Sequence, residues 1–373
     1  MAHAALTHAR ARPDPRASRR WPASGNRRRG EGIWLVTYDG DWRETFRPDI
    51  PSVARIYDYL LGGKDNYPVD RAVGESMIAQ LPNVRLAVQW NRAFLRRVVR
   101  YLIREAGIRQ IIDIGAGLPT AGNTHEVALE ACPQARVVYV DHDPIVLAHA
   151  RSMLHGVPGT AVIGRDMLEP DSILADRSLR ELIDFNEPVA LLFLSILHFV
   201  ADEADPAGII SRLLAPFPAG SHVAISHATP DEVPEVNDVE RVFDEATTQA
   251  HVRSRAEIRK LVAGMDIIEP GLAWPPEWRP DPGDEIPANA VESYYCVVVA
   301  RTARPAPAPP DRRPHRPTGA RGTGRDRYRH YRLWGRTVWQ PVRAPLRALV
   351  SRDAGASSRR ASWPGHNRDD VTS

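Results

Sequence analysis

Short apolar runs alternate with helix-like segments through the middle of the chain, and this alternation constrains the fold more than any other feature. Five runs have the composition of strands buried on both faces, and they lie at 110–115, 136–141, 160–166, 188–194 and 221–227. Helix-start signals lie between and after these runs, at Asn123 with Glu126, Asp143 with Pro144, and Ser254 with Glu257. Strands that alternate with helices predict a doubly wound α/β fold with a mostly parallel sheet.

The last third of the body departs from this alternation. Two further apolar runs, 265–272 and 293–302, are joined by a Pro- and Trp-rich connection that has no helical pattern. Because no crossover helix separates them, the two runs predict an antiparallel pair of strands at one edge of the sheet.

A helical region precedes the first strand. Residues 51–63 place apolar side chains at helical spacing and end at two glycines, and residues 87–107 carry a second apolar stripe. A polar turn lies between these helices and is expected to close over a ligand; the other interpretation is a solvated turn. The lid and substrate residues predicted here are Tyr57, Gly63, Asp65, Asn66 and Tyr67.

Charge separates the chain into a central body and two basic ends. Residues 1–30 hold eight Arg and one Asp, and residues 301–373 hold 17 Arg and five acidic residues. Since the net charge of the whole chain is only +3, residues 31–300 carry −16, and the basic ends account for the pI of about 9.0. A nucleic-acid-binding body is not indicated, so any contact with nucleic acid is expected through the ends alone.

These shifts in composition predict four parts of the chain. Low-complexity, Arg-rich ends of this kind are typical of disorder. The predicted parts are a basic disordered extension at 1–45, a helical cap at 46–107, a cofactor-binding domain at 108–302 and a basic disordered tail at 303–373.

Cysteine use and hydropathy indicate the compartment. The two cysteines, Cys132 and Cys296, are too few for a disulfide framework or a four-cysteine zinc site, so no metal is expected. The longest apolar run, 189–200, is too short to span a bilayer, and no secretory signal follows the N-terminal arginines. We expect a soluble cytoplasmic protein.

A glycine turn follows the first predicted strand and indicates a ligand close to the backbone. A phosphate-binding P-loop would need a Lys after the glycines, and neither of the two lysines of the chain lies there. A dinucleotide fingerprint would need a third small residue where Thr120 stands. The form present, Asp113-Ile-Gly115-Ala116-Gly117, lets the backbone approach an adenosyl ligand that carries an amino acid group, with the acid near the ammonium end of that ligand.

Acids at the ends of the next two strands support a nucleoside ligand. Asp141 ends the second strand, 24 residues after Gly117, where a carboxylate can accept hydrogen bonds from both ribose hydroxyls. This fits S-adenosylmethionine (SAM) and NAD equally well; a helix-capping role is the other interpretation, but Asp143 already supplies that cap. Asp166 is placed to meet an adenine amino group, with Met167 as an apolar wall, unless it is a solvated loop acid.

Several long motifs, in the same order along the chain, resemble the bacterial S-adenosyl methyltransferase family. The motifs are "SVARIYDYLLGGKDNYPVDR", "NRAFLRR", "DIGAGLPTAGNTHEVA", "ARVVYVDHDPIVLAHAR", "LHFV" with "DPAGII", and "AISHAT". The resemblance covers about residues 48–300 and implies a Rossmann-like class I methyltransferase fold with an N-terminal helical cap and SAM as cofactor. It does not imply a substrate, and the basic ends depart from the family.

The motifs and the resemblance together define a candidate site. Because the fourth strand of this fold ends facing the methyl group, His198 is the candidate general base, although it could instead be a packed core histidine; His227 is a weaker candidate. The residues expected to bind the cofactor are Asp113, Gly115, Ala116, Gly117, Asn123, Asp141, His142, Asp166, Met167 and Ser195.

The predicted function is SAM-dependent methylation of a small-molecule acceptor. Two alternative classes of protein would also have the glycine turn and the acids at the ends of the strands. One is an NAD-dependent oxidoreductase, which should lack the antiparallel ending; the other is a regulatory protein that binds SAM without catalysis.

Overall fold

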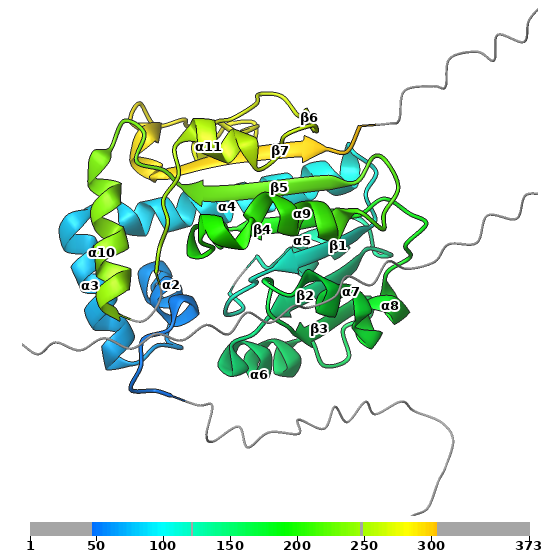
Figure 1. Ribbon diagram of the computed structural model, residues 1–373, viewed down its shortest axis with the longest axis horizontal. Coiled ribbons are helices and arrows are strands. Elements are labelled where there is room, and N and C mark those ends of the chain that lie inside the picture. The colour runs from blue at the N-terminus through cyan, green and yellow to red at the C-terminus, as the bar shows by residue number, and fades with distance from the viewer. Residues whose placement is uncertain (1–46, 121, 247–248, 304–373) are drawn as a thin grey trace, which may run out of the picture. The chain divides into compact units, whose positions relative to one another are not determined.

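A computed structural model describes residues 47–120, 122–246 and 249–303, which belong to one compact unit. Its centre is a seven-stranded sheet with the strand order β3-β2-β1-β4-β5-β7-β6 (Figure 1). The extensions predicted to be disordered, at 1–45 and 303–373, lie outside the described residues apart from residue 303.

Five strands of the sheet are parallel, as the apolar runs predicted. Strand order reverses beside β1, which pairs with β2 on one side and β4 on the other. In such sheets, ligands bind where the order reverses, at the carboxyl ends of the strands. The parallel strands are β1 (Gln110–Ile114), β2 (Arg136–Asp141), β3 (Thr160–Gly164), β4 (Ala190–Leu194) and β5 (His222–Ala228).

The antiparallel ending is also confirmed, with one strand much shorter than expected. β7 (Tyr295–Arg301) pairs with β5 along its length and with β6 (Asp266–Ile267) on its other side. The run at 265–272 was expected to be a strand throughout, but only two of its residues pair in β6. Pro270 explains part of this difference, because it has no N–H to donate to a neighbouring strand.

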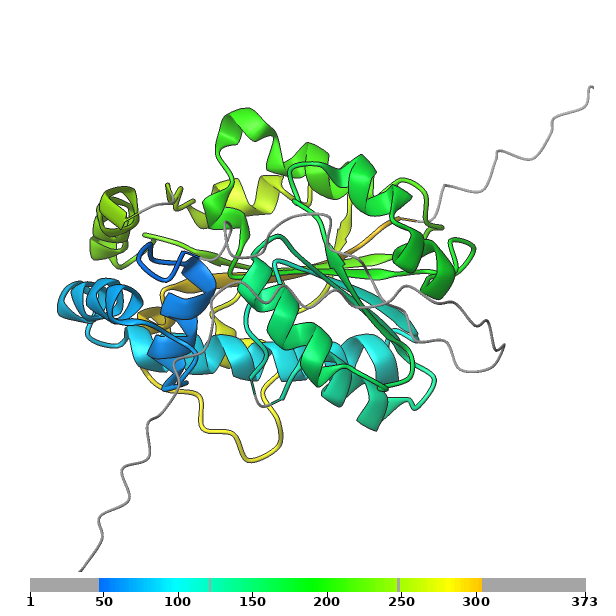
Figure 2. The same ribbon diagram turned by 90° about the horizontal axis from the view of Figure 1, so that it is seen from below.

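Helices cover both faces of the sheet (Figure 2). Ile112 and Ile114 of β1 pack among α7, α8, α9 and α11, while Ile111 packs on the opposite face among residues of α4 and α5. Strands buried on both faces need apolar side chains at every position, which is why the runs do not alternate with polar residues. These helices are α4 (Val84–Arg104), α5 (Thr124–Ala131), α6 (Pro144–Met153), α7 (Pro170–Ala175), α8 (Arg177–Leu182), α9 (Pro206–Leu214) and α11 (Arg255–Lys260).

All three predicted helix starts are confirmed. Asp143 Oδ1 accepts a hydrogen bond from the backbone two residues on, at 2.8 Å. Glu126 Oε2 accepts from the N–H of Asn123 at 3.0 Å, and Glu257 Oε2 accepts from the N–H of Ser254 at 2.9 Å. These side chains satisfy backbone groups that have no partner within the helix.

Helices α2 (Val53–Leu61), α3 (Pro68–Gln80) and α10 (Asn237–Ala246) gather as a cap at the end of the sheet to which β5 points, and the first turns of α4 pack with them (Figure 1). α2 ends at Gly62, whose φ of 83° is the left-handed conformation that glycine adopts without strain. α3, α10 and the first turns of α4 complete this cap around a separate cluster of buried apolar side chains. The sequence patterns did not indicate α10.

Short 3-10 helices lie in the connections. Within the described ranges, no helix combines the length and the apolar character that crossing a bilayer requires. The 3-10 helices are η1 (Leu197–Phe199), η2 (Asp202–Ala204), η3 (Pro234–Val236), η4 (Pro275–Glu277) and η5 (Ala290–Ser293).

Candidate functional site

A cavity of about 460 Å³ lies between the cap and the carboxyl ends of the parallel strands. Its volume is in the range of sites for small molecules. The structure brings most of the predicted site residues together on its walls. These are Tyr57, Asp113, Gly115, Ala116, Gly117, Asp141, His142, Asp166, Met167, Ser195 and His198.

The two glycines of the turn after β1 serve different purposes. Both have a φ of 67°, but a Cβ added to Gly115 would lie 2.3 Å from Cγ1 of Ile196, whereas one added to Gly117 would meet no atom within 4 Å. Gly115 is therefore required by packing between β1 and the end of β4. Gly117 instead leaves open space on the cavity wall, where a ligand can approach the backbone.

Asp141 connects the glycine turn to the end of β2. Its Oδ2 accepts from the N–H of Gly117 at 2.9 Å, and its Oδ1 accepts from the N–H of Asp143 at 2.9 Å. Burial raises the pKa of Asp141, and the two N–H donors partly offset that rise. Each oxygen keeps a second lone pair, so the carboxylate can accept two more hydrogen bonds from neighbouring hydroxyls.

Asp113 and Arg92 place opposite charges at one end of the cavity. The buried carboxylate of Asp113 accepts from Thr124 Oγ1 at 2.6 Å. Burial raises the pKa of Asp113 to about 6, and the positive charge of Arg92 acts against that rise. Arg92 lines the cavity from α4, and its Nη2 donates to the carbonyl of Gly122 at 3.2 Å. The sequence alone did not single out Arg92, because this helix contains several arginines and nothing in their spacing distinguishes one of them.

Asn123 does not line the cavity. Its Oδ1 accepts from the N–H of Thr120 at 2.9 Å, and its own N–H donates to Glu126. The side chain thus shapes the loop between the glycine turn and α5, one layer behind the cavity wall.

The polar turn after α2 does not contribute to the lining of the cavity either. Asp58 Oδ2 accepts from the N–H of Asp65 at 2.9 Å and from Nδ2 of Asn66 at 2.8 Å. Of the predicted lid residues, Gly63, Asp65, Asn66 and Tyr67 are therefore outside the lining, and Tyr57 is part of it. The face of α2 reaches the cavity, whereas the turn that follows is held against Asp58.

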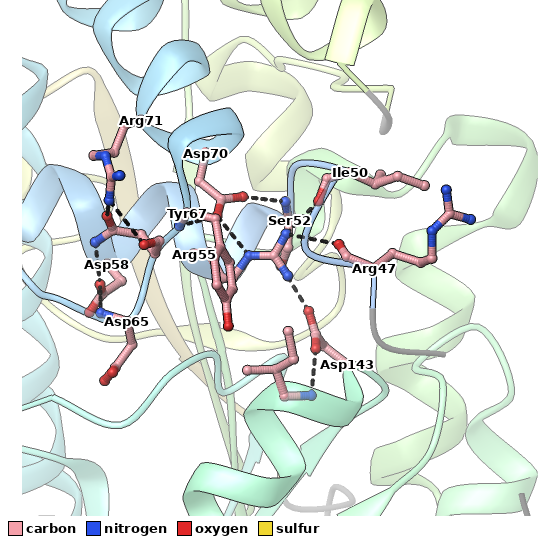
Figure 3. Close-up of polar contacts among 12 residues, drawn as sticks. Arg47, Ile50, Ser52, Arg55, Asp58, Asp65, Tyr67, Asp70, Arg71 and Asp143 are labelled. Carbon is pink, nitrogen blue, oxygen red and sulfur yellow. Dashed lines mark hydrogen bonds and ion pairs between the residues drawn. The ribbon is translucent and has the colours of Figure 1, made fainter. Parts of the chain in front are cut away.

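The start of α2 is bonded to the start of α6 and to α3 (Figure 3). Ser52 Oγ donates to Asp143 Oδ2 at 2.8 Å, beside the end of β2. Asp70 accepts from the N–H of Ser52 at 2.9 Å, from the N–H of Tyr67 at 2.7 Å, and from Nε of Arg55 at 2.8 Å. The Arg55–Asp70 ion pair is almost completely buried, so it joins the starts of α2 and α3 at a defined distance.

His198 lies in η1, just past the end of β4, and lines the cavity. Its ring is buried, and its Nδ1 has no hydrogen-bond partner. Burial holds the pKa of His198 well below its ordinary value, and the nearby His227 and Arg253 lower it further. The imidazole is consequently neutral near pH 7.

Arg253 holds the turn that carries His198. All five of its N–H donors are used, by the carbonyls of Leu197 and Val200, by Nε2 of His227, and twice by Oδ1 of Asp202, at distances of 2.7 to 3.0 Å. Nδ1 of His227 lies 2.7 Å from a backbone carbonyl and carries the proton, so its Nε2 is free to accept from Arg253. The fork geometry of the guanidinium thereby joins η1, η2 and β5.

Ser195 and Tyr295 supply uncharged polar groups at the end of β4. Ser195 has a φ of 60°, and its Oγ lies 2.9 Å from the hydroxyl of Tyr295. Burial raises the pKa of Tyr295 further above its ordinary value, so its hydroxyl stays protonated. Among the described residues, no group of three or more His, Cys, Asp or Glu side chains is arranged to hold a metal ion.

The sheet, the glycine turn and the acid that ends β2 define a class I methyltransferase fold. The chain belongs to the S-adenosyl methyltransferase family, which matches residues 42–303. The protein is a SAM-dependent methyltransferase, and S-adenosylmethionine is its cofactor. The two alternatives considered above, an NAD-dependent oxidoreductase and a non-catalytic SAM-binding protein, are not supported.

Two solved structures are similar along most of the body. A DUF574-family protein from Streptomyces avermitilis is 40% identical, with a TM-score of 0.67, over 69% of this chain and 100% of that one. A putative methyltransferase from Thermobifida fusca is 35% identical, with a TM-score of 0.65, over 68% of this chain and 95% of that one. No curated protein matches the chain.

The walls of the cavity fit this cofactor. Gly117 leaves open space beside the backbone, and Asp141 keeps lone pairs for two hydroxyls. Asp113 and Arg92 match the two opposite charges of an amino acid group.

Proposed function

We propose that this methyltransferase acts on a small-molecule acceptor that shares one cavity with the cofactor. The observation that supports the proposal is the division of the cavity into two halves. Acids and glycines line one half, at the carboxyl ends of the strands, and apolar side chains of the cap line the other. When bound, SAM supplies an electrophilic methyl group for in-line displacement.

In the half of the cavity next to the strands, the proposed roles follow from the side chains. Asp141 accepts hydrogen bonds from the ribose hydroxyls, and Asp166 with Met167 contacts the adenine ring. Asp113 faces the ammonium group, and Arg92 faces the carboxylate. This assignment places the methyl group toward the end of β4, near Ser195 and His198.

In the other half, the cap encloses the methyl acceptor. Apolar side chains from α2, α3, α4 and α10 surround this space and exclude water from it. Exclusion of water strengthens the polar contacts that remain. The walls include Leu60, Met77, Val88, Val239 and Phe243.

His198 contributes mainly by orienting the nucleophile. A neutral imidazole can form a hydrogen bond with the attacking group, but the lowered pKa makes it a weak base. We therefore expect near-attack positioning by the cavity walls to lower the barrier more than proton removal does.

The test is a methylation assay on fractionated cell extract. The enzyme with SAM is incubated with the small-molecule filtrate, with protein and with nucleic acid, and each fraction is searched by mass spectrometry for the gain of one CH2 group. We expect the gain in the filtrate alone, and its loss with Asp141→Ala, which should weaken SAM binding by roughly 1.5–3 kcal/mol. Methylation confined to protein or nucleic acid would overturn the proposal.

A further inference from the structure

We propose that the methyl acceptor is a neutral, mainly apolar molecule that donates one O–H or N–H hydrogen bond to Asn91. This inference rests on the proposed function, because it concerns the half of the same cavity that lies inside the cap. It specifies the chemical class of the acceptor, which the family does not.

The cap contributes one charged side chain to the described lining of the cavity, Arg92 of α4. Among the described residues that line the cavity, the charged ones are Arg92, Asp113, Asp141, Asp143 and Asp166, which come from α4 and from the ends of β1, β2 and β3. The described lining residues from α2, α3 and α10, and from the segments after β5 and before β7, have no charge. Since Arg92 faces the carboxylate of the cofactor in the proposed arrangement, a carboxylate or ammonium group of the acceptor would lose its hydration without gaining an opposite charge.

Asn91 places one unpaired hydrogen-bond acceptor at the wall of this apolar space. The residue lines the cavity from α4 and is only 3% exposed. Its Nδ2 donates to the hydroxyl oxygen of Tyr57 at 3.0 Å, and that hydroxyl donates its own proton to the carbonyl of Val88 at 3.4 Å. Because the proton of Tyr57 is used in this way, the amide must turn its NH2 group toward Tyr57.

The orientation of the amide leaves its oxygen without a partner. Asn91 Oδ1 is buried, and no hydrogen bond reaches it. A buried acceptor without a donor is unfavourable, so a ligand that brings a donor gains affinity. An amide oxygen repels carboxylates and cannot pair with a group that has no N–H or O–H. The ligand that these walls match is uncharged and carries a hydroxyl or a neutral amine.

The test uses the full chain saturated with S-adenosylhomocysteine and four naphthalene probes. The probes are 1-naphthol, its methyl ether, 1-naphthoate and 1-naphthylmethylammonium, and calorimetry measures the Kd of each. We expect 1-naphthol to bind about tenfold more tightly than the methyl ether, the difference of one hydrogen bond. The two ions should bind more weakly than 1-naphthol.

Two variants separate the role of Asn91 from a general loss of structure. Asn91→Leu keeps the size of the side chain and should abolish the preference for 1-naphthol over its ether. Tyr57→Phe keeps the ring, frees the amide to rotate, and should reduce the same preference. Asn186→Leu, in the exposed turn before β4, is the matched control and should leave it unchanged.

Three outcomes would overturn the inference: absence of 1-naphthol binding, tighter binding of either ion, or an unchanged preference in Asn91→Leu. The affinity for S-adenosylhomocysteine is measured in every variant and should not change. Methylation of macromolecules alone, in the assay described above, would instead count against the proposed function, so the two failures are distinguishable.

Discussion

Asp113 and Asp141 illustrate how a binding site is formed at a cost in stability. Both carboxylates are held at strand ends beside the cavity, and burial raises the pKa of each. A buried carboxylate is harder to ionise than one in water, so the folded protein loses free energy when these groups carry charge. A bound cation at the same position would recover part of that loss.

Asp113→Asn should therefore stabilise the protein without cofactor. The pKa of Asp113 is about 6 in the folded state, above its ordinary 3.8, so the folded state binds the proton more tightly. The contribution of this group to stability is present below pH 3.8 and is lost as the pH rises through about 6. Denaturant unfolding should show the variant more stable by on the order of 2 kcal/mol at pH 7.5, and by much less at pH 4.

The same substitution should weaken SAM binding, because the carboxylate that faces the ammonium group is lost. Thr124 keeps a partner in the variant, since the amide oxygen of Asn can accept its hydroxyl proton. Equal stabilisation at both pH values would show that Asp113 does not titrate as the burial of its carboxylate requires.

At the scale of elements, Arg253 joins segments that are far apart in sequence. Its side chain is 6% exposed, whereas its partner Asp202 is 82% exposed, so the two ends of this ion pair differ greatly in hydration. The bonds to the carbonyls of Leu197 and Val200 are buried, and they hold η1, the short helix that contains His198.

Arg253→Met should lower the free energy of unfolding by about 3 kcal/mol, because two buried carbonyls and His227 lose their donor. Asp202→Asn is the matched control and should change it by less than about 1 kcal/mol, as is usual for an exposed partner. Denaturant unfolding of both variants measures the difference. Similar effects in the two variants would mean that the ion pair, and not the buried bonds, stabilises the turn.

α2 and the turn that follows it are expected to close over the cofactor. α2 lines the cavity, and Ser52 joins its start to the start of α6, which follows β2. Hydrogen exchange of residues 56–70 should slow when SAM is added, and by more than exchange in residues 87–106, because lids over a ligand are the less stable parts of a fold. If the addition of SAM leaves exchange in residues 56–70 unchanged, α2 is a fixed part of the scaffold.

For the molecule as a whole, the family match and the charge divide the chain at similar places. The family match ends at residues 42 and 303, and residues 31–300 carry a net charge of −16. The described residues of the three apolar clusters lie between these limits. Thr302 still belongs to the body, because its N–H donates to the carbonyl of Ser221 at 2.8 Å.

A fragment comprising residues 42–303 should therefore fold and bind SAM with the affinity of the full chain. Circular dichroism and calorimetry measure the two properties. If the full chain binds nucleic acid, that affinity should be absent from the fragment and should fall steeply with added salt, since the net positive charge lies at the ends. Weaker SAM binding by the fragment would show that the ends contribute to the site.

Much of the fold and part of the site followed from local sequence. Strand runs, helix caps and the Asp113–Gly117 turn depend on residues close together in the chain, so their patterns predicted β1 to β5 and the start of α5 correctly. The sequence predicted that Asp141 binds the ligand, because Asp143 already accounted for the cap of the following helix. The polar turn at 64–67 was predicted to meet ligand, but Asp58 satisfies it internally.

The amino-acid sequence alone determined the order of elements, the glycine turn, the acid after β2 and the separation of charge along the chain. Only the tertiary structure decided that α10 joins the cap, that Arg92 and Asn91 face the cavity, and that His198 is neutral. The physical reason is the separation in sequence between the residues on which each feature depends. A helix cap or a strand depends on neighbours in sequence, whereas burial, pKa and an unpaired oxygen depend on side chains that only folding brings together.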